Sequence, residues 1–399
     1  MVWSKSIERL RCPVCGAQAP LRVEAALAKS AKGELLEGVL RCGACPRWFR
    51  VERGVADLVR DELREVADER VFLRKYEAQL PEGFVRSAQP VALDQSRPEP
   101  NEADARIIAE GRHWGRFMRR FWDVGDRSIF DIRIKGTHPR YYLAGILERD
   151  DRDVTRRFSF FPPRVGAVLF TQLGEFRDRW GVDVGCGGGQ MGLEAAYQGV
   201  QMIGLDPAFE ALALARQHAR EQKIETIDYV RGEPSNPPLA DGGFALLMAK
   251  DSLHHVPDLP RAMERVVALG EPGATLIVHE HIARADLKEA VMNRLRPRAI
   301  AKIRRRYPSI DIPGELLRDS ANEDVSAHLV RAEVLRHCRV SEEANCLFLA
   351  EELEALAYYA FGKRRWFARL VRVAGAVMES ALLMAGNRQH WSARGRLEH

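Results

Sequence analysis

Residues 182–190 read Val-Asp-Val-Gly-Cys-Gly-Gly-Gly-Gln, and this stretch decides the fold. Its apolar start is typical of a short buried strand, and its glycines predict a tight turn directly after that strand. A second apolar stretch, residues 202–206, ends on the carboxylate of Asp206. A glycine-rich turn followed about 20 residues later by an acidic residue is typical of a nucleotide-binding βαβ unit. The pattern predicts a ligand lying almost on the backbone of the turn, with Asp206 accepting hydrogen bonds from a ribose diol.

Apolar stretches alternate with helical ones on both sides of that turn. The pattern predicts strands over residues 181–184, 201–205, 227–230, 244–249 and 274–279, and helices over 164–176, 189–198, 208–221 and 259–269. Such alternation indicates an α/β fold with a doubly wound, Rossmann-like, mostly parallel sheet. Beyond residue 280 we expect a basic helical region over 287–307, a short strand pair within 337–349 and a closing helix over 364–386.

Composition and charge are those of an ordinary globular protein. The 399 residues are 46% hydrophobic and 29% charged, which is long enough for two or three domains. The net charge of +5 does not reach the strongly basic patterning that by itself points to nucleic acid. The first ten residues carry charges and lack the apolar core of an export signal, and no run of roughly 18 uncharged apolar residues occurs. We therefore expect a cytoplasmic protein without a transmembrane helix.

Four of the seven cysteines lie near the start of the chain, in two Cys-x-x-Cys pairs. Cys12 and Cys15 form the first pair, and Cys42 and Cys45 form the second after 26 intervening residues. Each pair presents two thiolates on a tight turn, and four such ligands suit tetrahedral Zn²⁺. Four cysteines also close the coordination shell, so we expect a structural zinc that supplies folding energy to a small module.

The stretch after the second pair strengthens this interpretation. Together with the cysteines, residues 48–58 resemble the small zinc-ribbon proteins that activate methyltransferases in archaea and eukaryotes. The ending Val-Ala-Asp-Leu at residues 55–58 stands where Ile-Pro-Asp-Leu is usual in that family. The resemblance implies a zinc ribbon over residues 1–60.

The central region resembles the class I S-adenosylmethionine-dependent methyltransferases. Their first motif, an acidic residue followed by Gly-x-Gly-x-Gly, is matched by residues 183–189, and their second by residues 203–207. Further matches in the same order are residues 232–233, 241–245, 250–256, 259–268 and 270–276. The tetrad at residues 236–239, Asn-Pro-Pro-Leu, is similar to that of amino-group methyltransferases, but it precedes the fourth strand and lacks the aromatic residue, so we interpret it as a loop.

This resemblance implies S-adenosylmethionine as a cofactor and assigns its binding residues. The implied residues are Asp183, Gly185, Gly187, Gly189, Asp206, Glu233 and Lys250. The glycines would cradle the methionine part with help from Asp183, Asp206 would hold the ribose hydroxyls, and Glu233 would face the adenine. Two positions depart from the family pattern, because Ala245 replaces a frequent Asp and Glu233 is one methylene longer than the usual residue.

Methyl transfer from a sulfonium requires alignment of donor and acceptor, and a base where the acceptor carries a proton to be removed. Candidate catalytic residues follow the fourth and fifth strands, at the edge where open α/β sheets bind ligands. They are His254, His255, His279 and Glu280. The histidines have packing and capping roles as alternatives. The segment at residues 279–281 could also bind a metal, for which spacing names no third ligand.

These features predict four regions. They are the zinc ribbon at residues 1–60, a linker and helical cover at 61–160, the methyltransferase core at 161–284 and a C-terminal helical region at 285–396 that completes core and cover. The cover includes His138 and Tyr141 as weaker catalytic candidates.

The leading hypothesis is methyl transfer to a small-molecule acceptor, such as a secondary metabolite, a quinone-like lipid or a sugar, at oxygen, nitrogen or carbon. An RNA methyltransferase that uses the ribbon and the basic helix at residues 294–306 for recognition is an alternative. A non-catalytic cofactor-binding scaffold is another. A dehydrogenase is a fourth, because Gly187, Gly189 and Gly192 also match the dinucleotide pattern Gly-x-Gly-x-x-Gly.

The closing helix carries an apolar stripe with helical spacing. Its members are Phe367, Leu370, Val371, Ala374, Met378, Ala381, Leu382 and Ala385. The stripe favours packing on the domain or on a second copy of the chain, and the Arg-Arg-Trp-Phe start at residues 364–367 leaves a peripheral membrane contact open.

Overall fold

A computed structural model describes most of the chain. Described are residues 2–16, 18–85, 88, 100–123, 125, 127, 129–131, 163–282, 286–306, 326–361, 364–386 and 389–398. His138 and Tyr141 of the predicted cover lie outside the described residues.

The centre of the molecule is a parallel sheet built by five strands. They are β5 (Trp180–Val184), β6 (Gln201–Asp206), β7 (Ile227–Arg231), β8 (Phe244–Lys250) and β9 (Gly270–His281). The strands lie in the order β7-β6-β5-β8-β9, and each neighbouring pair is parallel. Each strand and helix predicted over residues 164–279 is present, but the helix predicted over 164–176 ends at Phe170 and is followed by a 3-10 turn at Leu173–Phe176, and the strand predicted from residue 274 begins at Gly270.

Helices cover both faces of this sheet, as a doubly wound fold requires. The covering helices are α6 (Pro163–Phe170), α7 (Gln190–Tyr197), α8 (Phe209–Glu221), α9 (Leu259–Leu269) and α11 (Ala327–His337). Alternation along β6 shows the two faces, because Met202 joins the core cluster of α7 and α8 whereas Ile203 joins that of α9. Both side chains are almost completely buried.

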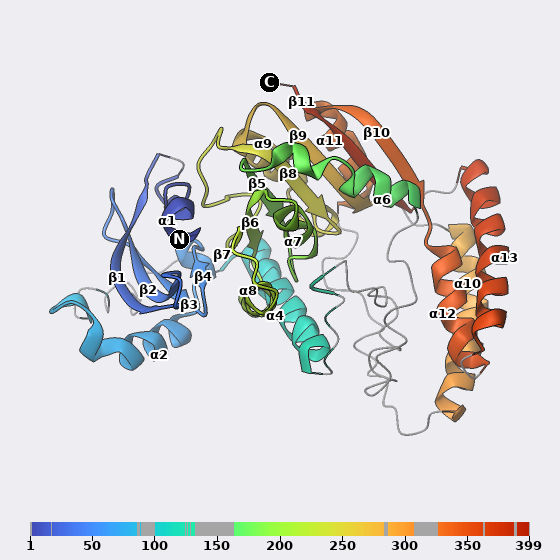
Figure 1. The fold of residues 1–399 in the computed structure, drawn as a ribbon, viewed down its shortest axis with the longest axis horizontal. Coiled ribbons are helices and arrows are strands. Elements are labelled where there is room, and N and C mark those ends of the chain that lie inside the picture. The colour runs from blue at the N-terminus through green and yellow to red at the C-terminus, as the bar shows by residue number, and fades with distance from the viewer. Residues whose placement is uncertain are drawn as a thin grey trace.

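The sheet continues beyond β9 with two strands from the end of the chain. β11 (His390–Leu397) is antiparallel to β9, and β10 (Cys338–Cys346) is antiparallel to β11 (Figure 1). The expected strand pair within 337–349 is therefore wrong, because this region supplies one strand whose partner is β11. The sequence did not indicate β11, since its Arg and Gly residues interrupt the apolar alternation of a typical strand.

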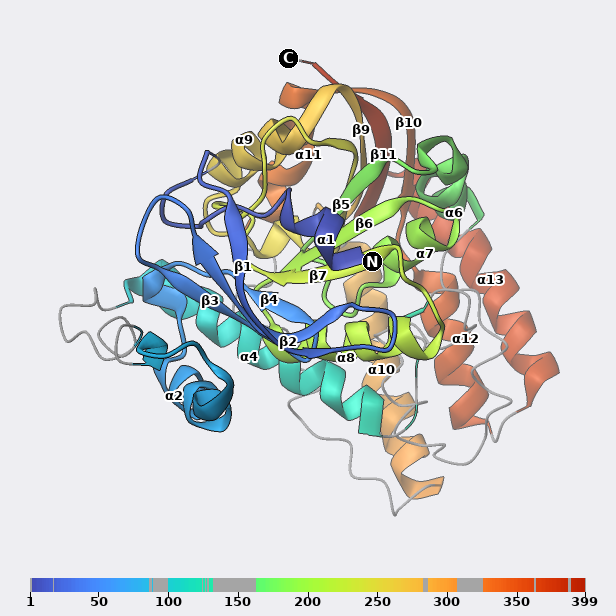
Figure 2. The same ribbon diagram turned by 60° about the vertical axis from the view of Figure 1, so that its left-hand side comes forward.

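At the opposite edge the sheet is extended by the start of the chain. β1 (Leu21–Lys29), β2 (Leu35–Cys42), β3 (Trp48–Glu52) and β4 (Val55–Asp57) form an antiparallel meander. β4 then pairs in parallel with β7, with Val55 opposite Tyr229 and Ala56 opposite Val230 (Figure 2). The complete eleven-stranded sheet is therefore mixed, and parallel pairing is confined to β4 and the five central strands.

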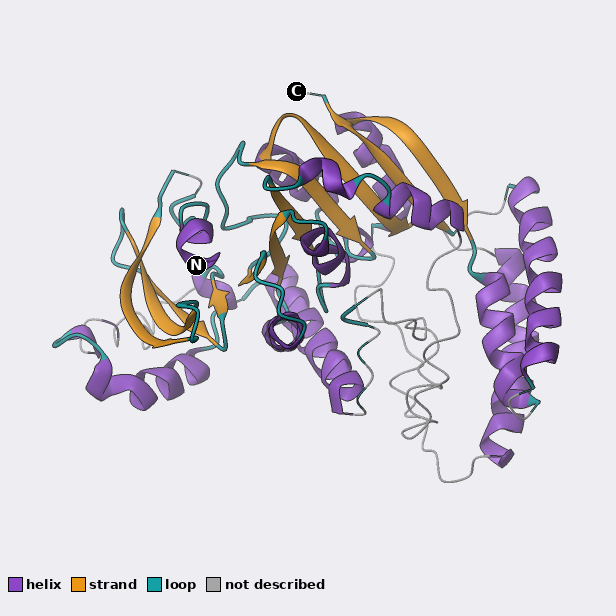
Figure 3. Ribbon diagram, in the orientation of Figure 1, coloured by secondary structure: helices purple, strands orange, loops and turns teal. Residues whose placement is uncertain are grey.

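The remaining helices lie around this sheet (Figure 3). They are α1 (Val2–Ile7), α2 (Val66–Tyr76), α4 (Glu102–Asp123), α10 (Asp286–Arg306), α12 (Leu349–Ala360) and α13 (Arg365–Met384), with short 3-10 turns at Asp61–Leu63, Glu77–Gln79, Leu173–Phe176 and Leu253–His255. α4 packs on α8, while α10, α12 and α13 lie side by side beyond the β10–β11 edge (Figure 1). The predicted region boundaries stay predictions.

The closing helix α13 packs differently from its predicted stripe. Ala368, Gly375 and Glu379 are its buried residues, and Gly375 lies directly against Ala350 of α12. Leu370 of the stripe is 59% exposed, and Val377, which adjoins the stripe member Met378 in the sequence, is 68% exposed. Contacts of this face with a second chain or a membrane surface stay predictions. Among the described residues, no helix is both long and apolar enough to span a bilayer.

Candidate functional site

The glycine-rich turn between β5 and α7 has the backbone that the sequence predicted. Gly185, Gly187 and Gly189 have φ values of +65°, +49° and +79°, which favour glycine. A Cβ on Gly185 would lie 2.3 Å from the Cβ of Ser252, so the packing of the chain itself requires this glycine. A Cβ on Gly187 would meet only Met118 Cε of α4, at 3.3 Å. The helix α4 thus covers the turn.

Asp206 at the end of β6 lies against the same turn. Its Oδ2 accepts a hydrogen bond from Gly187 N at 2.8 Å, and its Oδ1 accepts one from Ala208 N at 2.7 Å. Burial raises the pKa of the Asp206 carboxyl to about 6, although these two backbone donors favour the charged form. The structure therefore brings together the two features from which the site was predicted.

Asp183 at the end of β5 is a second buried carboxylate beneath the turn. Its Oδ2 accepts a hydrogen bond from Gly192 N at 2.7 Å, whereas its Oδ1 has no hydrogen-bond partner among the described residues. Burial raises the pKa of Asp183 to about 7, while the charge of Lys250 acts in the opposite direction. Lys250 itself donates to Asp251 Oδ2 at 2.6 Å. The site thus holds a buried acceptor oxygen next to a cation.

Glu233 is engaged by residues of the N-terminal region. Its Oε1 accepts a hydrogen bond from Arg60 Nε, and Arg60 also donates to Asp104 Oδ1 of α4 at 2.8 Å. Its Oε2 accepts a hydrogen bond from Ser235 Oγ at 3.1 Å. Arg60 therefore joins the segment after β4, the loop after β7 and α4. The sequence did not indicate this contact, because the three segments lie far apart along the chain.

His254 and His255, on the turn after β8, face two different carboxylates. His254 Nδ1 lies 2.7 Å from Glu280 Oε2, and His255 Nδ1 lies 3.3 Å from Glu110 Oε1 of α4. Trp114 Nε1 donates to the same Glu110 oxygen at 2.7 Å, and its ring lies edge-on to His255. Sequence reasoning missed Glu110 and Trp114, which lie in a helix distant in sequence from the methyltransferase motifs.

Glu280, a predicted catalytic residue, is completely buried. Its Oε1 accepts hydrogen bonds from Ser252 N at 3.0 Å and from Leu253 N at 2.8 Å. Together with its contact to His254 Nδ1, these bonds fix the turn after β8. The geometry makes Glu280 an anchor that orients His254.

His279 contacts Ser392 of β11 and lies near Asp251. Its Nδ1 lies 2.8 Å from Ser392 Oγ, and its Nε2 lies 3.8 Å from Asp251 Oδ1. Burial lowers the pKa of His279 to about 4, although Asp251 favours the protonated form. The four predicted catalytic residues thus form two groups, with His254, His255 and Glu280 in one and His279 in the other.

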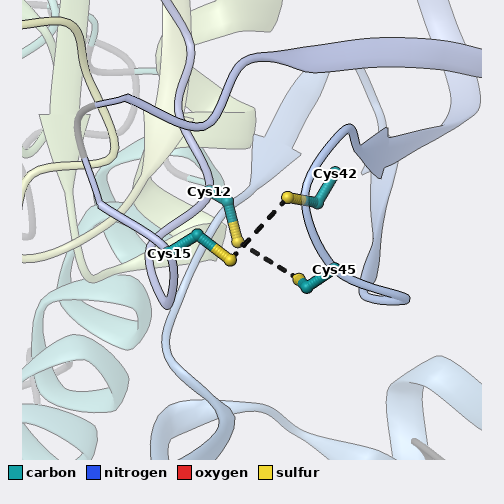
Figure 4. Close-up of side chains that lie close together, drawn as sticks. All are labelled: Cys12, Cys15, Cys42 and Cys45. Atoms are coloured by element: carbon teal, nitrogen blue, oxygen red, sulfur yellow. Dashed lines mark hydrogen bonds between the residues drawn. The ribbon is translucent and has the colours of Figure 1, made fainter.

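The four N-terminal cysteines converge (Figure 4). Cys12 Sγ lies 3.9 Å from Cys45 Sγ, Cys42 Sγ lies 3.9 Å from Cys15 Sγ, and all four sulfur atoms lie within 4.8 Å of one another. Thiolates around tetrahedral zinc, with Zn–S bonds of about 2.3 Å, are separated by about 3.8 Å. All four are free cysteines, so the chemistry and the spacing of this donor set fit zinc.

Comparisons with known proteins find similar sequences for the central region of the chain. Residues 182–278 match a family model described as "Methyltransferase domain". The Ubiquinone biosynthesis O-methyltransferase of Escherichia coli O157:H7 is 30% identical over 118 residues, which are 29% of this chain and 45% of that protein. That of Bordetella parapertussis is 33% identical over 114 residues, which are 28% and 46% of the two chains. The chain thus spans less than half the length of these relatives.

Solved structures of methyltransferases are also similar. A geranyl diphosphate methyltransferase in complex with GPP and sinefungin has a TM-score of 0.42 at 12% identity, covering 71% of this chain and 99% of that one. The Haemonchus contortus phosphoethanolamine N-methyltransferase 2 in complex with S-adenosyl-L-methionine has a TM-score of 0.34 at 14% identity, covering 55% and 48%. From the family match, the central region of this chain, residues 182–278, is a methyltransferase domain.

Proposed function

We propose that this protein transfers the methyl group of S-adenosylmethionine to a small-molecule acceptor by in-line displacement. The observation that carries the proposal is the glycine turn held by Asp206 inside the matched methyltransferase domain. The relatives that match this domain are named as O-methyltransferases, which favours a hydroxyl acceptor of the quinone-like class. No contact of the described residues favours RNA or a non-catalytic scaffold over this reaction.

The donor atoms around the turn fit the cofactor. Asp183 Oδ1 is a buried acceptor oxygen without a hydrogen-bond partner among the described residues, and the ammonium group of the methionine part would supply a donor. Hydrogen bonds from Gly187 N and Ala208 N fix both carboxylate oxygens of Asp206 at the end of β6. A ribose diol would add further hydrogen bonds there. The bound cofactor supplies the activated methyl group on its sulfonium. The protein has to place the acceptor in line with it and remove a proton.

The turn after β8 supplies the candidate base. Glu280 binds His254 Nδ1, and a carboxylate in this position orients an imidazole and stabilises its protonated form. On the neighbouring side, Trp114 packs edge-on against both Phe117 and His255. We infer that these aromatic rings of α4 contact the acceptor and that His254 accepts its proton.

We also propose that the cysteine cluster holds a structural Zn²⁺ and that the ribbon stabilises the methyltransferase core within the same chain. Several contacts support this role. β4 pairs with β7, Leu58 N donates to Arg231 O at 3.0 Å, and Asn236 Nδ2 donates to Pro13 O at 2.7 Å beside the first cysteine pair. The loop at residues 236–239 thus contacts the ribbon.

Isothermal titration calorimetry with S-adenosylhomocysteine tests the proposed cofactor site. Wild-type protein is expected to bind one equivalent, and Asp206→Ala to bind at least tenfold more weakly, because the ribose loses its acceptor. Asp206→Asn keeps the side-chain shape and separates loss of charge from loss of structure. Asp241→Ala is the matched control, since this surface carboxylate, in the loop before β8, lies 3.2 Å from Arg265 Nη2 of α9. Equal affinity of Asp206→Ala and wild type would refute the proposal.

A further inference from the structure

A second group of potential metal ligands lies at the opposite edge of the parallel sheet from the cysteines. Asp251 follows β8, His279 lies near the end of β9, and His390 begins β11. One donor atom from each side chain lies within 4.8 Å of those of the other two. Strand pairing produces this convergence, because β9 lies between β8 and β11 and is hydrogen-bonded to both.

Both imidazoles approach the same carboxylate oxygen. His279 Nε2 lies 3.8 Å from Asp251 Oδ1, and His390 Nδ1 lies 3.8 Å from that atom. Nitrogen and oxygen ligands at about 2.1 Å from a tetrahedral metal ion are about 3.4 Å apart. A small contraction, within the range of side-chain rotations, would bring the three donors onto one ion.

The carboxylate of Asp251 is held in place for this geometry. Asp251 has a φ of +48°, and its backbone N donates to His279 O at 2.7 Å. Lys250 Nζ binds Oδ2 at 2.6 Å, which leaves Oδ1 directed to the histidines. This buried oxygen accepts no hydrogen bond from any described residue. A left-handed backbone on a residue other than glycine costs about 1 kcal/mol or more and is typical of functional positions.

The orientation of His279 is also fixed. Its Nδ1 lies 2.8 Å from Ser392 Oγ, which is directly opposite His279 in the β9–β11 pairing. A hydrogen bond at Nδ1 leaves Nε2 as the ligand atom, as is usual for metal-bound histidines. The rings of His279 and His390 are stacked at an interplanar angle of 7°. Both rings therefore face Asp251 from the same side.

We propose that Asp251, His279 and His390 bind a divalent transition-metal ion of the Zn²⁺ and Mn²⁺ class. Two imidazoles and one carboxylate suit such ions, whereas Mg²⁺ and Ca²⁺ prefer oxygen ligands alone. Three protein ligands leave coordination positions open, as in catalytic sites. The open side is that of Asp251, whose side chain is 35% exposed while both histidines are buried.

The ion would lie near the glycine turn, where it could activate the acceptor hydroxyl; this role rests on the proposed function. Ser252, the residue after Asp251, donates its Oγ proton to Val184 O at 2.9 Å and lies against Gly185 of the glycine turn. An acceptor hydroxyl on the ion would lose its proton more readily. Its oxygen would then form the O–CH₃ bond as the S–CH₃ bond breaks, with the proton leaving to a base and S-adenosylhomocysteine as the second product.

Metal binding by the full chain tests the proposal without any acceptor. Elemental analysis of wild-type protein after incubation with excess Zn²⁺ and gel filtration should give two zinc ions per chain, one in the ribbon and one in this site. Mn²⁺ is then titrated into protein that carries only ribbon zinc, with the free ion followed by electron paramagnetic resonance. Soft thiolates disfavour Mn²⁺, so its binding reports the Asp–His site alone.

Two variants and one control decide the outcome. Asp251→Asn, which keeps shape at a partly exposed position, and His390→Gln should each weaken Mn²⁺ binding at least tenfold and leave one zinc per chain. His255→Gln removes a histidine that contacts Glu110 and should bind Mn²⁺ like wild type. One zinc per chain and no Mn²⁺ uptake by wild type, or unchanged uptake by both variants, would overturn the proposal. Calorimetry with Asp251→Asn measures its affinity for S-adenosylhomocysteine and so shows independently whether the variant keeps the cofactor site.

Discussion

The two edges of the central sheet are extended in opposite ways. At the β7 edge, the start of the chain adds four strands whose loops bring four cysteines within 4.8 Å of one another. At the β9 edge, the end of the chain adds β11 and β10, and an Asp–His–His group forms where β8, β9 and β11 meet. The four cysteines come in pairs on two turns and could surround an ion, whereas the three side chains at the other edge leave one side open.

This difference predicts that the cysteine site stabilises the fold and that the Asp–His–His site takes part in chemistry. Cys12 and Cys42 belong to the same core cluster as Val182 and Leu205 of the central strands. We therefore expect loss of the proposed zinc to disturb the core. Asp251 is partly exposed and is bound to Lys250, so the second site is expected to lose its ion without loss of the fold.

The largest effect is expected from Cys12→Ser combined with Cys15→Ser. Structural zinc supplies about 10–16 kcal/mol of binding free energy in isolated fingers, so we expect to lose on the order of 5 kcal/mol or more of the free energy of unfolding. Differential scanning calorimetry and zinc analysis measure both losses. Cys346→Ala, a buried cysteine of β10 at the other edge, is the control and should keep its zinc. A double variant that melts like the control would show that the two edges do not differ in this way.

A smaller effect is expected at the junction of the ribbon with the core. Arg216 of α8 is completely buried and lies 3.2 Å from Glu34 Oε2 and 3.5 Å from Asp228 Oδ1, and it donates to Ile227 O at 2.6 Å. Arg216→Met leaves two buried carboxylates without their cation, which costs about 3–5 kcal/mol. Urea unfolding measures this loss.

Adding Glu34→Gln and Asp228→Asn to Arg216→Met removes the uncompensated charges. The triple variant is expected to recover part of the lost stability, because the penalty comes from unpaired charge. No recovery would mean that Arg216 acts through packing, and the charge-based account of this junction would then be wrong.

The sequence predicted the parts of the fold whose signals are local. The glycine turn and Asp206 lie within one βαβ unit, and each cysteine pair lies on one turn, so spacing alone indicated which residues would meet. The helices and strands over residues 164–279 were predicted because apolar periodicity and glycines mark them, although the helix predicted over 164–176 ends at Phe170.

The missed features depend on pairings between distant segments. His390 meets Asp251 only because β11 returns to pair with β9, and its strand contains Arg and Gly where a typical strand has apolar residues. Arg60 meets Glu233 for a similar reason, since β4 pairs with β7. In α13, helical periodicity predicted an apolar stripe, but the described buried residues are Ala368, Gly375, which lies against Ala350, and Glu379, which accepts hydrogen bonds from Leu347 N and Leu349 N.

The smallest effect is expected between the two edges, at Asp183. Burial raises its pKa to about 7 from an ordinary value of 3.8. A carboxyl whose folded pKa is raised stabilises the fold below pH 4, and this stability is lost as the pH rises from about 4 to about 7. Each unit is worth about 1.36 kcal/mol, and allowing for relaxation we expect the ligand-free Asp183→Asn variant to be about 2 kcal/mol more stable than wild type at pH 8.

Urea unfolding of wild type and Asp183→Asn at pH 4 and pH 8 checks this sign. The gain should be present in full at pH 8 and much smaller at pH 4, where the wild-type carboxyl is protonated in the folded state and partly protonated in the unfolded state. The same variant should bind S-adenosylhomocysteine more weakly, because the amide no longer carries the charge that attracts an ammonium group. Asp241→Asn, a control at an exposed carboxylate, should change neither quantity. Greater stability together with weaker binding would mean that Asp183 is kept charged for its ligand. A variant that is less stable than wild type at pH 8 would instead mean that Asp183 stabilises the glycine turn through its hydrogen bond from Gly192 N.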